Sequence, residues 1–183
     1  MKILKKILIA IGILILIPLI VAMFIKSDYQ VEREITINKP KSDVFAYLKF
    51  LKNQDNFSKW ASIDKNMEKT FVGTDGTVGF VSAWNSTNPD VGKGEQEIKK
   101  IIEGERIDYE LRFMEPFESS SAAYILTESI SDSQTKVSWG FSGHMAYPMN
   151  LMMLFMDFEK MIGDDFATGL EKLKLILEKQ ESI

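Results

Sequence analysis

The sequence predicts an α+β protein in which an antiparallel, strongly curved sheet wraps around a long C-terminal helix, with an N-terminal transmembrane helix before this domain. Three patterns support this prediction: an apolar run near the N-terminus, two-residue alternation of apolar and polar positions in the middle, and helical spacing after Pro148. A chain of 183 residues has room for one core of common size. We therefore expect a membrane anchor at residues 1–26 and one globular domain at residues 27–183.

The predicted anchor is residues 7–25, where every residue is apolar, Gly or Pro. At 1.5 Å per residue this run is close to the roughly 30 Å of hydrocarbon in a bilayer. A signal peptide has a shorter apolar core and small residues before its cleavage site, and the sequence offers no convincing pair of that kind. The alternatives are a cleaved signal and a buried core helix.

The charges around the anchor predict its orientation. Lys2, Lys5 and Lys6 precede the apolar run, so the positive-inside rule places the N-terminus in the cytoplasm. Lys26 follows the run and weakens this bias slightly. We expect the domain on the outer side of the membrane, periplasmic or extracellular.

The remainder of the chain is acidic. Removing the four lysines of the first 26 residues leaves 18 basic against 26 acidic residues, a formal charge of −8. Nucleic-acid binding needs a basic surface that offsets phosphate repulsion. We therefore expect no nucleic-acid partner.

The expected elements of the domain follow from periodicity. Alternation predicts a first strand at residues 31–37, although Arg33 falls on its apolar side. Pro40 is suited to a helix start. The remaining expected elements are a helix at 40–51, a short helical piece at 56–61, antiparallel strands within 69–128 with glycine turns at 74–77 and 103–105, a strand at 136–145, and a long helix at 155–177 that Gly163 interrupts or kinks.

Several segments carry a family resemblance. They are Ile37-Asn38-Lys39-Pro40 with Val44-Phe45 and Leu48, Phe57-Ser58-Lys59-Trp60, Val78-Gly79-Phe80 with Trp84, Gly92-Lys93-Gly94-Glu95-Gln96-Glu97-Ile98, Thr135-Lys136-Val137-Ser138-Trp139 with Gly143, and Asp165-Phe166-Ala167-Thr168-Gly169-Leu170-Glu171-Lys172-Leu173-Lys174. In this order, over residues 29–179, the chain resembles the SRPBCC superfamily of START-like proteins, in the branch labelled polyketide cyclase/dehydrase. The resemblance implies a helix-grip fold that binds hydrophobic ligands, and it implies no single reaction.

A curved sheet around one helix leaves room for an apolar cavity, and aromatic side chains with a polar tip suit its wall. Gln96 shares a strand face with Gly94 and Ile98, so its amide is placed to point inward. For each aromatic residue the alternative is simple core filling. The candidate ligand-binding residues are Trp60, Trp84, Gln96, Tyr109, Phe113, Tyr124, Trp139, Phe141, Met152, Phe155 and Phe166.

Catalytic chemistry has little support. The chain has no cysteine, which excludes thiolate metal sites and cysteine nucleophiles. Its one histidine, His144, alternates with Trp139 and Phe141 and so belongs to the opposite strand face. The sequence contains no recognisable triad, phosphate loop or dinucleotide fingerprint. We expect no catalytic residue, no cofactor and no metal.

Methionines concentrate at the start of the last predicted helix. Six of the ten lie at residues 145–161, and residues 151–156 are apolar on all sides, which one buried face does not explain. An adaptable pocket mouth, contact with the bilayer, a protein partner and an irregular core are the competing explanations. We favour a segment that gates ligand access and contacts the membrane.

The leading functional hypothesis is therefore membrane-anchored binding, with transfer as its extension, of a lipid-like or polycyclic molecule in an internal cavity. A cyclase or dehydratase acting on a polyketide-like or aromatic substrate is the first alternative, and two facing ionisable side chains in the pocket would favour it. The second alternative is a protein-interaction module with a collapsed pocket, which a dense core would favour.

Overall fold

Seven antiparallel strands form one sheet in the computed structural model, which describes residues 2–179. The strands are β1 Asp28–Ile37, β2 Glu68–Val72, β3 Val81–Asn85, β4 Lys93–Ile102, β5 Arg106–Glu115, β6 Ser119–Ser131 and β7 Gln134–His144. Their order across the sheet is β1-β7-β6-β5-β4-β3-β2. The first and last strands of the domain are therefore neighbours, and β2 forms the far edge.

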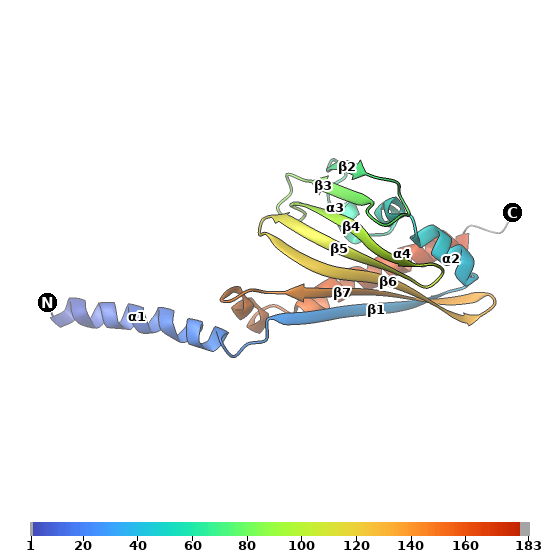
Figure 1. Cartoon of the computed structure of the whole chain (residues 1–183). Coiled ribbons are helices and arrows are strands. Elements are labelled where there is room, and N and C mark those ends of the chain that lie inside the picture. The colour runs from blue at the N-terminus through green and yellow to red at the C-terminus, as the bar shows by residue number, and fades with distance from the viewer. Residues whose placement is uncertain (1, 180–183) are drawn as a thin grey trace.

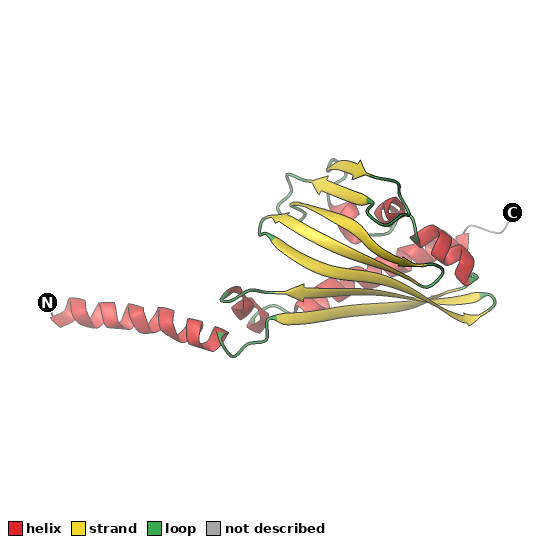
Figure 2. Ribbon diagram, in the orientation of Figure 1, coloured by secondary structure: helices red, strands yellow, loops and turns green. Residues whose placement is uncertain are grey.

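The helical elements are α1 Lys2–Ala22, α2 Lys41–Leu48, η1 Leu51–Asn56, α3 Lys59–Ile63, η2 Met149–Leu154 and α4 Phe158–Lys179, where η denotes a 3₁₀ helix. The long helix α4 lies against one face of the sheet, chiefly on β1, and α2 packs on β6 and β7. Figures 1 and 2 show the sheet curving around α4 while α1 projects away from the domain. This arrangement confirms the predicted α+β fold.

The sheet buries one face because apolar residues alternate along each strand. Inward-facing residues of three neighbouring strands, Ile107, Ile125 and Val137, are almost completely buried, as are Leu170 and Leu173 of α4. Burying such side chains contributes on the order of 1.5–3 kcal/mol each. The core thus lies between α4 and the concave face of the sheet. The turn glycines Gly76 and Gly104 have positive φ values of 78° and 72°, as their predicted hairpin turns require.

The first helical region is shorter than predicted. Pro40 occupies the position before α2, but α2 ends at Leu48 rather than at residue 51. The Asp75 carboxylate accepts hydrogen bonds from the backbone N–H groups of Leu51 and Lys52, at 2.8 and 3.2 Å. These bonds to a distant loop satisfy the first amides of a separate helical turn, η1.

The C-terminal helical region also divides where one helix was predicted. A hydrogen bond of 2.9 Å from the backbone N–H of Lys160 to Asp157 Oδ1 caps the first turn of α4. Residues 149–154, with Met152, form the separate 3₁₀ helix η2. The expectation of a break at Gly163 is wrong, because α4 is continuous through that residue.

Helix α1 has 21 residues and a length of about 31 Å. Its apolar side chains are exposed along its length, and by length and composition it is sufficient to cross a membrane. The helix ends at Ala22, so the last three residues of the predicted span, ending at Ile25, lie in the turn that leads to β1.

Candidate functional site

Five inward-facing side chains form the concave strip, which we define as Trp84, Gln96, Leu111, Phe113 and Phe141. Strand register supports this for the residues of β3, β4 and β5. Gln96 is paired with Leu111, and Gly94 is paired with Trp84 on one side and with Phe113 on the other. Each of the five is only half-buried, although the same face is fully buried where α4 covers it. The strip is therefore apolar surface on the inner side of the sheet that the helix leaves partly open.

Trp84 and Phe113 form one end of the strip. Their rings meet edge to face, with centroids 6.1 Å apart and an interplanar angle of 73°. The Trp84 indole N–H donates to the carbonyl oxygen of Val91 at 3.4 Å. A Cβ at Gly94 would lie 2.5 Å from the Trp84 ring, so glycine is needed for the ring to lie against β4. The ring pair is thus positioned by three strands.

Tyr109 occupies the next inward row, between Ile98 of β4 and Ala123 of β6. Only 3% of it is exposed. Burial raises the pKa of the Tyr109 hydroxyl, so the phenol remains neutral and retains its O–H donor. This residue forms the buried wall beside the half-open strip.

Three further candidates pack as an aromatic stack between the sheet and the helices. Trp139 of β7 stacks on Phe166 of α4 with centroids 4.4 Å apart and an interplanar angle of 11°. Trp60 of α3 meets Phe166 edge-on at 5.8 Å, and Phe57 meets Trp139 edge-on at 5.6 Å. Trp139 and Phe166 are each 3% exposed. Here the aromatic side chains fill the space in which the sequence predicted a cavity.

Tyr124 does not face the interior, which corrects its expected role. It lies on the convex face, where its hydroxyl donates to the Glu32 carboxylate and the Arg106 guanidinium carbon lies 4.0 Å from the ring centroid. A Cβ at Gly140 would lie 2.3 Å from the Tyr124 ring, so the ring covers the backbone of β7. Alternation along β6 explains this position. Ala123, Ile125 and Thr127 are the buried, inward residues, so Tyr124 points to the opposite face.

Met152 and Phe155 are also separate from the concave strip. Met152 belongs to η2, and Phe155 follows it with 84% of its surface exposed. Helix η2 contacts α1, away from the strip. Leu111, in contrast, joins the strip although the sequence did not single it out. Its signal was the alternation that places it on the same face as Tyr109 and Phe113.

Two hollows lie among the described residues, and the second shares Trp84 with the strip. One of about 330 Å³ follows the side of α1. Another, of about 240 Å³, lies at the open edge of the sheet and is lined by Glu68, Thr70, Ala83, Trp84, Asn85, Lys93, Gly94 and Met114. The second is smaller than the roughly 300–1,000 Å³ of typical ligand pockets. The concave strip is therefore a better candidate than either hollow.

The chemistry of the strip is apolar. Its members include no ionisable side chain, and Gln96 supplies its one amide. Within residues 2–179 no three His, Cys, Asp or Glu side chains are grouped so that they could hold a metal ion. His144 Nδ1 lies 2.7 Å from Asp28 Oδ1, but both side chains are mostly exposed at the strand ends. The strip thus offers apolar contact area and one side-chain amide.

Comparison with solved structures identifies the fold. Norcoclaurine synthase from Thalictrum flavum, in complex with dopamine and hydroxybenzaldehyde, aligns with a TM-score of 0.63 and 7% identity over 90% of this chain and 94% of that chain. Ara h 8.0201 aligns with a TM-score of 0.56 and 15% identity, covering 84% and 99% of the two chains. The Aha1 structure from Colwellia psychrerythraea gives 0.56 and 13%, with the same coverage.

No family model matches the sequence, and no curated protein matches it. At these identities, structural likeness establishes the fold and not the activity. The neighbours are helix-grip proteins, consistent with the resemblance to the SRPBCC superfamily. The chain thus has a helix-grip fold with an apolar helix in front of it.

Proposed function

We propose that this chain is an SRPBCC-type protein that binds a hydrophobic small molecule on the concave strip while α1 anchors it in a membrane. One observation carries the proposal: Trp84, Leu111, Phe113 and Phe141 face inward and yet are only partly buried. The concave face is buried where α4 covers it, but apolar surface remains accessible at these side chains. An apolar ligand would remove that surface from water.

The composition of the strip indicates the ligand class. A charged ligand would find no opposite charge among its side chains, whereas a largely apolar molecule with one polar group could use the Gln96 amide as donor or acceptor. The perpendicular rings of Trp84 and Phe113 offer contact area to a planar ring or an acyl chain. We infer a neutral lipid-like or polycyclic ligand. The aromatic compounds bound by norcoclaurine synthase support small-molecule binding by this architecture.

The anchor belongs to the same proposal. Lys2, Lys5 and Lys6 at the start of α1 favour a cytoplasmic N-terminus, which directs the domain to the outer side. A C-terminal alkaline phosphatase fusion, which is active only outside the cytoplasm, should therefore be active. An inactive fusion with normal expression would reverse the orientation.

A protein-interaction module is the second candidate, because the aromatic stack around Trp139 and Phe166 fills the space beside α4. In that case the strip would be a protein contact and no small molecule would accompany the purified chain. An enzyme has less support, since the strip has no ionisable side chain to serve as acid or base.

Native mass spectrometry of the gently purified full chain, followed by organic extraction, tests the proposal. Phe113→Ser should lose a co-purified ligand, whereas Ile130→Ser should retain it, because Ile130 is 53% exposed and lies at the other end of β6 from Ser119, the partner of Phe113. Both variants must keep the parental circular dichroism spectrum. Gln96→Met provides a variant of similar volume that removes only the amide.

A stoichiometric ligand that is reduced at least several-fold by Phe113→Ser or Gln96→Met supports the proposal. A ligand-free parental chain, or equal retention by all variants, contradicts it. A ligand-free chain that captures a protein through the strip would favour the interaction module.

A further inference from the structure

Asn150 joins the domain to the end of the proposed membrane helix. Only 2% of this residue is exposed, and its side-chain amide donates to the carbonyl oxygens of Ala22 and Ile25 at 2.8 and 3.0 Å. Ala22 is the last residue of α1. The C-terminal carbonyl groups of a helix lack partners within the helix, so the Asn150 amide supplies one from η2. We call these two hydrogen bonds the Asn150 bridge.

A second contact supports this junction. The backbone N–H of Met145, just after β7, donates to the carbonyl oxygen of Ser27 at 2.8 Å. The segment that leads from α1 to β1 is therefore held on both sides, by η2 and by the end of β7. The anchor does not join the domain through a free linker.

Large apolar side chains lie exposed around the Asn150 bridge. We define the junction surface as Met23 and Phe24 after α1, together with Met149, Leu154 and Phe155 of η2 and its end. Their exposed fractions are 71, 84, 44, 57 and 84%. A group of exposed large apolar side chains of this kind usually marks a contact with a membrane or another protein.

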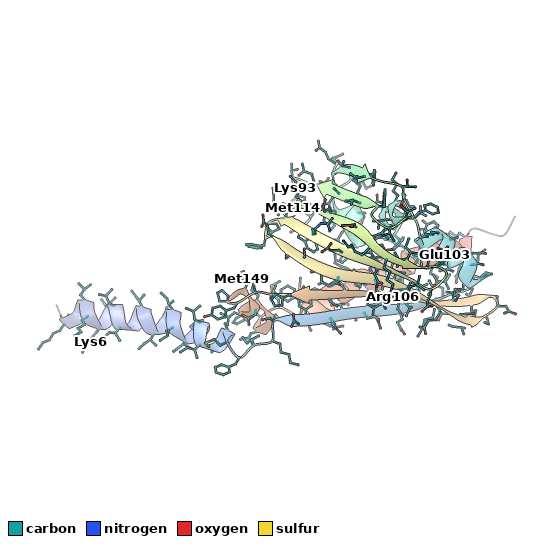
Figure 3. All side chains as sticks on the ribbon, viewed as in Figure 1. Lys6, Lys93, Glu103, Arg106, Met114 and Met149 are labelled. Carbon is teal, nitrogen blue, oxygen red and sulfur yellow. The ribbon has the colours of Figure 1, made fainter. Side chains whose placement is uncertain are left out.

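The position of this surface relative to α1 selects the membrane. The uncharged part of α1, residues 7–22, is about 24 Å long, so it needs the apolar residues that follow it to fill the roughly 30 Å of the hydrocarbon layer. Its C-terminal end, where Met23 and Phe24 follow, then lies at the boundary between acyl chains and headgroups. In Figure 3, Met149 lies beside that end of α1, whereas Lys6 lies toward the opposite end. The junction surface continues the exposed apolar surface of α1.

We propose that the junction surface inserts into the outer boundary of the bilayer, and that the Asn150 bridge holds the domain there in one orientation. The inference rests on the proposed span by α1 and does not depend on a ligand. Amphipathic segments bind such boundaries by burying apolar side chains about 5–10 Å deep. The acidic domain provides little electrostatic attraction to anionic lipids, so apolar contact is the main attraction expected.

This orientation has a consequence for the concave strip. Lys93 and Met114, at the strand ends next to Trp84 and Phe113, lie toward the Met149 end of the domain in Figure 3, and Glu103 and Arg106 lie toward the other end. The half-buried side chains Trp84 and Phe113 would thus lie at the end of the sheet that is nearer the membrane. A hydrophobic ligand could pass between bilayer and strip with a short path through water.

Single-cysteine labelling tests the proposal directly, because the chain has no native cysteine. Phe155→Cys, Leu14→Cys in α1 and Val72→Cys in β2 are each labelled with an environment-sensitive fluorophore in the full chain, reconstituted in phosphatidylcholine nanodiscs. Leu14 and Val72 are 74 and 61% exposed, so both accept a label. Spin-labelled lipids then report which probes lie in the bilayer.

The probe at Phe155 should be quenched at least threefold more than the probe at Val72, and the probe at Leu14 should also be quenched. If Leu14 is quenched and Phe155 matches Val72, the inference fails while the anchor stands. If Leu14 is not quenched, the anchor and the inference both fail. A Phe155 probe shielded from aqueous iodide but untouched by the lipid quencher indicates a protein contact and also contradicts the inference.

The role of the Asn150 bridge has its own control. Asn150→Ala, added to Phe155→Cys, should reduce quenching at Phe155 at least twofold and leave Leu14 unchanged. Asn53→Ala is the matched control, because Asn53 donates to the Tyr47 carbonyl oxygen at 2.8 Å, away from the junction. Equal quenching in the Asn150→Ala and parental proteins would exclude the bridge as the element that fixes the orientation.

Discussion

The guanidinium group of Arg33 in β1 occupies the space that a side chain at Gly163 of α4 would need. A Cβ at Gly163 would lie 2.0 Å from Arg33 Nη2. The same guanidinium donates a hydrogen bond of 2.6 Å to Glu159, one turn earlier in α4. This arrangement explains both a charged residue on an inward strand face and a glycine in the middle of a continuous helix.

Gly163→Ala should therefore stabilise the protein less than an ordinary glycine-to-alanine change in a helix. Alanine contributes about 1 kcal/mol over glycine in a helix interior. The new methyl group would displace Arg33 from Glu159, and a partly exposed ion pair contributes about 0.2–1 kcal/mol. In an Arg33→Ala background the same substitution should recover the full gain. Urea unfolding of the four proteins measures this coupling, and equal effects in both backgrounds would contradict it.

Removing the Asn150 amide should loosen the junction locally. Asn150→Ala removes two hydrogen bonds, each contributing about 0.5–1.5 kcal/mol. A loss of about 1–3 kcal/mol corresponds to roughly 5–160-fold faster exchange of the amides in residues 23–27 and 149–154. Asn150→Asp should be at least as harmful at neutral pH, because a carboxylate would face the two carbonyl oxygens without a donor. Unchanged exchange in both variants would contradict this prediction.

The aromatic stack should tolerate no added volume. In Gly169→Ala the new Cβ would lie 2.9 Å from the Trp139 ring and 3.3 Å from the Phe57 carbonyl oxygen. Since Phe166 stacks on Trp139, the ring has little freedom to move away. We expect a loss of about 1–3 kcal/mol of unfolding free energy despite the better helix propensity of alanine. The exposed neighbour Glu171→Ala should stay within about 0.5 kcal/mol, and urea unfolding compares the two.

The Tyr124 hydroxyl should ionise at a higher pH than an ordinary tyrosine. Its hydrogen bond to Glu32, together with partial burial, raises the pKa of Tyr124 to about 12. Its ordinary pKa is about 10, so its contribution to stability is fully present below pH 10 and is lost as the pH rises through about 12. In an ultraviolet titration of phenolate formation, Tyr124→Phe should lack the absorbance change near pH 12 that the parental protein shows.

The cause of the Tyr124 shift can be separated from burial. Glu32→Gln retains an acceptor oxygen but removes the negative charge, so the pKa of Tyr124 should fall toward 10. The stability difference between the parental protein and Tyr124→Phe should also shrink between pH 10 and pH 12. A titration of Glu32→Gln that matches the parental protein would exclude the carboxylate as the cause.

Much of the architecture followed from local pattern. Alternation at Ile107, Tyr109, Leu111 and Phe113 was sufficient to predict a two-faced strand, because successive side chains of a strand point to opposite sides. The length of the apolar run predicted α1 because helix rise and bilayer thickness are fixed quantities. The turns at Gly76 and Gly104 were predictable because a hairpin turn needs a residue that adopts positive φ, and glycine does so without strain.

Other features needed the chain to fold back on itself. The sequence of β6 does not indicate which residues face inward, since residues 119–123 are all Ser or Ala and do not distinguish the two faces. Sequence pattern alone therefore assigns Tyr124 to the wrong face. The first amides of η1 are bonded to Asp75, a residue of a distant loop. Nothing near Asn150 in the sequence indicates a hydrogen bond to Ala22, 128 residues earlier.

The sequence alone therefore determined that this protein has an apolar helix followed by a sheet that grips a C-terminal helix, because those features depend on periodicity and length. Only the tertiary structure decided which aromatic side chains are packed, as Trp139 is, and which remain half-open, as Phe113 is. The physical reason is that burial depends on where α4 crosses the sheet, and that position is set by contacts between residues far apart in the chain, such as Arg33 and Glu159.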